Sequence, residues 1–258
     1  MSQIPPQLYG SVPPQQPYQR RRVDFESIGV AWKIISSDFG TWAVASLITL
    51  MILLILMIPA IGFFYVKLFQ LVFTMQPGVG GRPNPFAFLQ IFELELMLAG
   101  LSLFVQPIQY IFLGGMSEMA LRQMEGIPIA ATDVFLGFRK FGSLYITGFC
   151  YTAAIFVGLL FFYVPGFIFA GLFCFAPILI IRGKAKAVDA LVRSWQILVG
   201  DLWMIALLLF CAQLLAGLGV FACYIGLIFT MPISSVVVAI TYRNFFPPNL
   251  QPTEGPRA

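Results

Sequence analysis

Residues 141–181, FGSLYITGFCYTAAIFVGLLFFYVPGFIFAGLFCFAPILII, form a run of 41 residues without a charged side chain. A helix that crosses the hydrocarbon layer of a membrane needs about 20 apolar residues. The run is therefore too long for one crossing and has the length of two helices joined by a turn. We place that turn at Val164-Pro165-Gly166, because proline and glycine interrupt helices. The stretch predicts a membrane-spanning helical hairpin.

Three further charge-free runs cover residues 41–66, 96–117 and 202–242. The first two fit one helix each, and the third has the length of a second hairpin. The composition agrees, because 59% hydrophobic residues with only 10% charged residues lies far outside the range of soluble proteins. We therefore predict an all-α integral membrane protein with six transmembrane helices.

The basic residues orient these helices. Thirteen of the fifteen lysines and arginines fall on the side of the chain termini, and only Lys67 and Arg82 fall on the other side. Segments rich in lysine and arginine stay in the cytoplasm, so we predict that both termini are cytoplasmic. The net charge of +4 is then a consequence of topology, and we expect no nucleic-acid partner.

The two ends of the chain differ from the middle. Residues 1–22 are rich in proline and glutamine and lack an apolar core, which is typical of a disordered tail. We predict a disordered cytoplasmic tail over residues 1–22, a six-span membrane domain over residues 23–246, and a short cytoplasmic tail over residues 247–258.

A short phrase recurs just before the apolar runs. AWKIISSDFG at residues 31–40 and SWQILVGDLW at residues 194–203 share the pattern Trp-x-Ile-(Ile or Leu)-x-x-Asp-(Phe or Leu). A looser copy, FRKFGSL, lies at residues 138–144. The recurrence predicts three copies of one unit.

A second phrase repeats later in each unit. GLFCFAPIL begins at Gly171 and GLIFTMPIS begins at Gly226, while GLSLFVQPI at Gly100 has one insertion. Each unit then contains an amphipathic segment followed by two crossings, so the three hairpins share one orientation. We expect the units at about residues 23–127, 128–183 and 184–246.

The amphipathic segments predict helices that lie in the headgroup plane. Aromatic residues at such positions anchor a helix at the membrane interface, and we assign this role to Trp32, Phe138 and Trp195. The chain then turns into the membrane, and a short polar side chain there caps the new helix. We expect the caps to be Asp38, Ser143 and Asp201. As an alternative, Asp38 and Asp201 bind a cation or couple protons.

Prolines recur in the second, fourth and sixth predicted spans, at Pro107, Pro177 and Pro232. A proline inside a helix removes a backbone hydrogen bond and kinks the helix. Such kinks either shape a static bundle or line the pathway of a transporter.

Few side chains are suited to chemistry. The chain has no histidine, which removes most general-base and metal-ligand chemistry, and its four cysteines all fall in predicted spans. Glu93 and Glu95 are candidates for an intramembrane polar site, but we expect both to be solvated at the outer membrane interface, with ion binding as the alternative. We expect Gln90, Gln106, Gln109 and Gln213 to bind helices together. No cofactor, metal site or catalytic residue is expected.

Residues 175–203 resemble a known family. APILII at residues 176–181, a short basic loop and AVDALVRSWQILVGDLW at residues 187–203 are similar to bacterial six-span membrane proteins related to the membrane domain beside some glycerophosphodiester phosphodiesterases, and to their uncharacterised stand-alone relatives. The resemblance implies the membrane domain alone, in the bacterial inner (cytoplasmic) membrane, and it transfers no catalytic residue because this chain has no histidine.

These observations favour a non-enzymatic function. We expect a membrane scaffold, accessory subunit or membrane-organising protein whose basic cytoplasmic face contacts anionic lipids or a protein partner. The alternative is a transporter of small solutes or lipids, with its pathway among the proline-containing spans.

Overall fold

The computed structural model describes residues 23–75, 87–160, 164–219 and 225–246. Both predicted tails lie outside these residues. No strand occurs in the described part of the chain. Its elements are α1 (Glu26–Ser37), α2 (Phe39–Met75), α3 (Ala87–Met124), η1 (Ala131–Lys140), α4 (Phe141–Leu160), α5 (Val164–Leu172), α6 (Ala176–Ile181), α7 (Ala187–Leu198), η2 (Val199–Asp201), α8 (Leu202–Leu218) and α9 (Ile225–Phe245).

The all-helical prediction is confirmed for the described residues, and the apolar helices indicate a membrane protein. Among the described residues, five segments are long and apolar enough to cross a membrane. A sixth apolar segment, Pro165–Ile181, is shorter. The five segments are Phe39–Gln70, Phe92–Met124, Ala131–Gly158, Ala187–Leu218 and Gly226–Phe245.

The predicted fourth span is divided into two short helices, α5 and α6. Ser194 on α7 bonds to both sides of this break: its hydroxyl donates to the Leu172 carbonyl at 2.5 Å and accepts from the Phe175 N–H at 3.2 Å. Ser194 is fully buried. The backbone groups freed by the break are therefore paired inside the protein, as an apolar environment requires.

The same break corrects the prediction for Pro177. Instead of kinking a continuous span, Pro177 lies in the first turn of α6. Proline is favoured there because the first N–H groups of a helix have no partner within the helix. Pro107 and Pro232 do lie inside long helices, α3 and α9 respectively.

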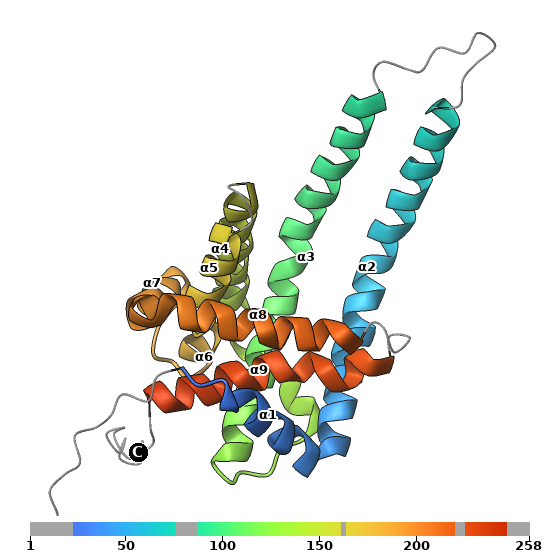
Figure 1. Cartoon of the computed structure of the whole chain (residues 1–258). Helices are drawn as coiled ribbons and strands as arrows, with labels where there is room; N and C mark the ends of the chain where they lie inside the picture. The colour runs from blue at the N-terminus through green and yellow to red at the C-terminus, as the bar shows by residue number, and fades with distance from the viewer. Residues whose placement is uncertain (1–22, 76–86, 161–163, 220–224, 247–258) are drawn as a thin grey trace, which may run out of the picture.

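The long helices pack as consecutive pairs: α2 with α3, α4 with α5, and α8 with α9. Helix α3 also packs against α4 and α9, so it contacts all three pairs. In Figure 1 the α2–α3 pair rises away from the rest of the molecule, while α8 and α9 run side by side across its lower part. The pairs thus diverge from a common packed region and do not form a parallel bundle.

Each amphipathic segment packs mainly on helices outside the pair that follows it in the chain. Helix α1 lies on α9, η1 on α3, and α7 on α4, α5 and α6. The residue just before each predicted aromatic anchor is small and buried: Ala31, Gly137 and Ser194. At Gly137 a Cβ atom would overlap the carbonyl oxygen of Ile111, so only glycine allows this close approach.

The predicted caps are corrected in part. Asp201 lies directly before α8, but its side chain makes no capping hydrogen bond. Its φ of −119° and ψ of 27° continue the turn of η2, whereas a capping residue has extended backbone angles. Ser143 lies inside the first turn of α4, because α4 follows η1 without an intervening residue. Asp38 lies between α1 and α2, and its backbone carbonyl accepts from the Trp42 N–H at 3.3 Å.

Ser194→Ala tests the pairing across the broken span. We expect the free energy of unfolding to fall by about 1–3 kcal/mol, because the variant leaves two buried backbone groups unpaired. Titration with SDS in mixed micelles measures this loss. In the matched variant Ser36→Ala, the exposed hydroxyl bonds only to the Lys33 carbonyl within α1, so we expect a change of at most about 0.5 kcal/mol. Equal stabilities of the two variants would contradict the assignment.

Candidate functional site

A charged cluster joins the ends of α3 and α6. Arg182 directly follows α6, and its Nε donates to Glu118 Oε2 at 2.9 Å while its Nη1 donates to Glu125 Oε1 at 2.8 Å. On α3, Arg122 Nε lies 3.7 Å from Glu118 Oε1. Arg122 Nη1 also lies 3.6 Å from Asp133 Oδ1 on η1. The cluster therefore connects three elements through alternating charges.

The charges of this cluster depend on one another. Glu118 is buried, and an isolated carboxylate there would be costly. Burial alone lowers the pKa of Arg182, but hydrogen bonds to Glu125 and Glu118 and the charges of both carboxylates outweigh it and raise this pKa above its ordinary value. Arg182 is therefore a permanent cation that keeps Glu118 compensated.

The ends of α9 and α1 meet the same end of α3. Arg243 on α9 donates to the Met124 carbonyl at 3.0 Å. Trp42 on α2 donates to Gln123 Oε1 at 2.8 Å, and Gln123 Nε2 donates to the Ile34 carbonyl of α1 at 2.9 Å. The C-terminal ends of α1, α3, α6 and α9 thus lie together.

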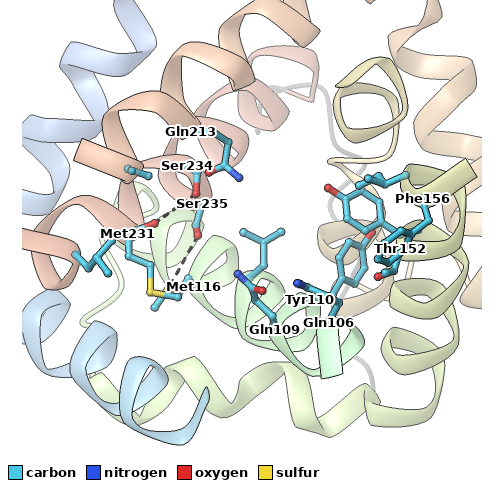
Figure 2. Close-up of a pocket in the computed structure, with 16 residues that line it drawn as sticks. Gln106, Gln109, Tyr110, Met116, Thr152, Phe156, Gln213, Met231, Ser234 and Ser235 are labelled. Atoms are coloured by element: carbon cyan, nitrogen blue, oxygen red, sulfur yellow. Dashed lines mark hydrogen bonds between the residues drawn. The ribbon is translucent and has the colours of Figure 1, made fainter. Parts of the chain in front are cut away.

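A cavity of about 580 Å³ lies between α3, α4, α8 and α9 (Figure 2). This volume lies within the range of small-molecule sites in proteins. None of the described residues that line the cavity is charged. They are Gln106, Gln109, Tyr110, Leu113, Met116, Tyr151, Thr152, Ile155, Phe156, Gln213, Ala216, Gly217, Leu227, Met231, Ser234 and Ser235.

Most hydroxyl donors in the cavity wall are already used within the protein. Thr152 donates to the Gly148 carbonyl, and Ser234 donates to the Met231 carbonyl. Tyr110 donates to a more distant carbonyl, that of residue 173, at 3.3 Å. Ser235 contacts a thioether sulfur, that of residue 116, at 3.8 Å. The hydroxyl oxygens therefore remain mainly as acceptors.

The three glutamines of the cavity differ from these hydroxyls. The side-chain amides of Gln106, Gln109 and Gln213 make no hydrogen bond to any residue that the structure describes, and all three residues are exposed. The prediction that they bind helices together therefore finds no support among the described contacts. Figure 2 shows the amide groups of Gln109 and Gln213 pointing into the space from opposite walls. Each amide offers both donors and an acceptor.

Two of the predicted prolines lie next to cavity residues. Pro107 follows Gln106 on α3, and Pro232 follows Met231 on α9. On α4, a Cβ atom at Gly148 would lie only 2.9 Å from the Cα of Pro107, so the two helices approach closely beside the cavity. The prolines therefore border the site without contributing polar groups to it.

The predicted interfacial anchors are exposed on their segments. Trp32 on α1 is 50% exposed, Trp195 on α7 is 38% exposed and Phe138 on η1 is 37% exposed. Phe138 packs near Phe112 with ring centroids 5.2 Å apart. The anchors lie on separate elements and do not converge on one site.

The predicted acidic site is not assembled in the described residues. Glu93 on α3 is exposed and takes part in none of the ion pairs found there, and the side chain of Glu95 lies outside the described part of the structure. No group of three His, Cys, Asp or Glu side chains among the described residues is placed to hold a metal ion. Of the four cysteines, Cys174 is buried, Cys150 and Cys211 are half-buried, and Cys223 lies outside the described residues.

Comparisons of the chain with protein-family models, with curated proteins and with solved structures found no match. The resemblance over residues 175–203 to the six-span family therefore stays a prediction.

Two features escaped the sequence analysis. The pairing of Glu118 with Arg182 joins residues 64 positions apart, so no local sequence pattern predicts it. The available signal was that Glu118 ends a charge-free run and lies one turn before Arg122, a spacing that favours an ion pair on one helix. The cavity had a signal too, since three glutamines in apolar helices are costly unless they have partners.

Glu118→Gln tests the importance of the charged cluster. We expect the free energy of unfolding to fall by about 3 kcal/mol, because the change removes one partner of a buried ion pair. SDS titration in mixed micelles again provides the measurement. Glu93→Gln makes the same change at an exposed position on the same helix and should alter stability by about 0.5 kcal/mol at most. A loss at Glu93 equal to that at Glu118 would contradict the role of the cluster.

Proposed function

We propose that the protein is a non-enzymatic, membrane-organising scaffold or accessory subunit that holds anionic lipid headgroups at one end of its helices. One observation carries the proposal: each amphipathic segment combines an exposed aromatic residue with an exposed lysine. These residues are Trp32 and Lys33 on α1, Phe138 and Lys140 on η1, and Trp195 on α7 with Lys186, which directly precedes α7.

The chemistry of these residues suits a membrane surface. An aromatic ring prefers the interface between water and hydrocarbon, and an exposed lysine on the same segment attracts anionic headgroups. The meeting of the C-terminal ends of α3, α6 and α9 supports the proposal that these helices end on the cytoplasmic side. In this arrangement the three units share one orientation, and both termini are cytoplasmic.

The three-unit organisation and the six spans belong to this proposal. Its support comes from the buried small residues Ala31, Gly137 and Ser194, which occupy the same position before each aromatic anchor and pack on a helix of another pair. We also propose residence in a bacterial inner membrane and membership of the six-span family, on the resemblance over residues 175–203.

Single lysine substitutions test the lipid contacts. We expect Lys33→Gln, Lys140→Gln and Lys186→Gln each to lower the affinity for phosphatidylglycerol about fivefold, because each lysine near the surface contributes about 1 kcal/mol. Native mass spectrometry of the protein purified in mild detergent measures the retained phosphatidylglycerol, and it also detects any companion protein in fixed proportion.

Lys67→Gln provides the control for these variants. Lys67 is also exposed, but it lies far along α2, over the ring of Phe63 at 5.6 Å, on the side predicted to face away from the cytoplasm. We expect this variant to retain phosphatidylglycerol as the unchanged protein does. Equal effects of all four substitutions, or no effect of any, would reject the proposal.

A transporter of small solutes or lipids is the second candidate, and the cavity between α3, α4, α8 and α9 favours it. In liposomes that contain a phospholipid with a nitrobenzoxadiazole label, a lipid transporter makes inner-leaflet label accessible to dithionite. We expect Ala216→Trp, which places an indole ring in the cavity, to slow this rate at least about tenfold while the protein stays folded, since the pathway would pass through this space. Leu214→Trp, an exposed position two residues away, is the control. Equal rates with and without the protein would exclude this activity.

A further inference from the structure

The cavity between α3, α4, α8 and α9 has the chemistry of a binding site that the basic segments do not explain. It lies among the long helices, and none of the exposed lysines Lys33, Lys140 and Lys186 lines it. Its polar groups come from four helices that are separate in the sequence. We propose that this cavity binds an uncharged amphipathic molecule with a hydroxyl-bearing head and one apolar chain.

The absence of charge in the described wall decides the charge of the ligand. A carboxylate or phosphate head would meet no lysine or arginine there, and an ammonium head would meet no aspartate or glutamate. An ion taken from water into such a site loses its hydration without gaining a partner, which costs several kcal/mol. A neutral head avoids this cost.

The polar groups of the wall decide the kind of head. The amides of Gln106, Gln109 and Gln213 supply donors and acceptors that are unused among the described residues. The oxygens of Thr152 and Ser234 remain as acceptors, because their hydrogens bond to backbone carbonyls. A hydroxyl group donates and accepts, so a head with two or more hydroxyls, such as glycerol, satisfies both kinds of partner.

The remaining wall fits an apolar chain. Leu113, Ile155, Phe156 and Leu227 offer hydrocarbon surface. Met231 adds a flexible thioether side chain that adapts to an irregular ligand. A volume of about 580 Å³ suits one small ligand or the head and upper chain of a single-chain lipid. The exposed glutamines leave the site open to a ligand from outside.

Three ligands with the same oleyl chain separate the effect of the head group. We would measure the binding of radiolabelled 1-oleoylglycerol, oleate and oleylamine to the purified full-length protein in detergent. We expect 1-oleoylglycerol to bind at least about tenfold more tightly than either ion, because only the neutral head enters without an unpaired charge. Ala216→Trp, which places an indole ring in the cavity, should lower this binding toward the background that the detergent shell contributes.

Gln109→Leu and Gln213→Leu test the head contacts. Each variant keeps the approximate size of the side chain and should weaken the binding of 1-oleoylglycerol about three- to tenfold through the loss of one hydrogen-bonding partner. Gln196→Leu, at an exposed position on α7 outside the cavity, should leave the affinity unchanged. Thermal unfolding of each variant verifies that it is folded.

The outcomes are distinct. Equal affinity for the three ligands, or equal affinity of the Gln109, Gln213 and Gln196 variants, would overturn the proposal, and preferential binding of oleate or oleylamine would assign the site to a charged ligand. The proposal supplies a ligand class for the second candidate function, but its test needs no transport. Binding of 1-oleoylglycerol without movement of lipid would therefore support the cavity site and reject the transporter. Retention of phosphatidylglycerol tests the scaffold proposal independently of both.

Discussion

The hydrogen bonds from Arg182 to Glu118 and Glu125 join helix ends that are far apart in the sequence. A carboxylate as buried as Glu118 persists in an apolar protein only when a cation compensates it. The ends of α3 and α6 must therefore stay together for the charge to be tolerated. Arg122 extends the cluster to η1, and Arg243 brings α9 to the same place through the Met124 carbonyl. The rest of the arrangement follows from this junction.

Away from the junction, the helix pairs follow a different physical rule. Where lipid is the solvent, apolar side chains gain nothing by leaving it, so a pair need not bury its outer surface. The α2–α3 pair fits this rule, since many apolar side chains of α2 are exposed. Close contact occurs instead where side chains are small. Gly158 packs on Gly166 in the α4–α5 pair, and Gly219 packs on Gly226 in the α8–α9 pair.

The sequence predicted features that depend on neighbours along the chain. The charge-free runs located the apolar helices, and the repeated tryptophan phrase located the junctions after α1 and α7, because helical periodicity and charge are local properties. Features that depend on distant partners were missed. Trp32 and Trp42 are both tryptophans close to the start of the first apolar run, and the sequence does not distinguish their environments. Trp32 is exposed, whereas Trp42 is fully buried and donates a hydrogen bond to Gln123, 81 residues away. The break in the predicted fourth span likewise depends on Ser194, which is 19 residues beyond Phe175.

The same contrast between local features and distant partners applies to the candidate site. The sequence marked Gln106, Gln109 and Gln213 as unusual polar groups but assigned them to helix packing, and only the fold brings them around one cavity. Hydroxyl side chains in the helices around the cavity satisfy their hydrogen bonds locally: Thr152 and Thr241 each donate to the carbonyl four residues earlier.

A glutamine side chain is longer and carries two kinds of polar atom, so one local carbonyl does not satisfy it. Three such amides around one space, with no partner among the described residues, therefore hold more unused hydrogen-bonding capacity than the hydroxyls of the same helices. Placing them there costs stability in an apolar environment. Hydrogen bonds from the hydroxyl groups of a bound ligand to these amides would offset that cost. An uncharged ligand with hydroxyl groups therefore complements the lining of the cavity.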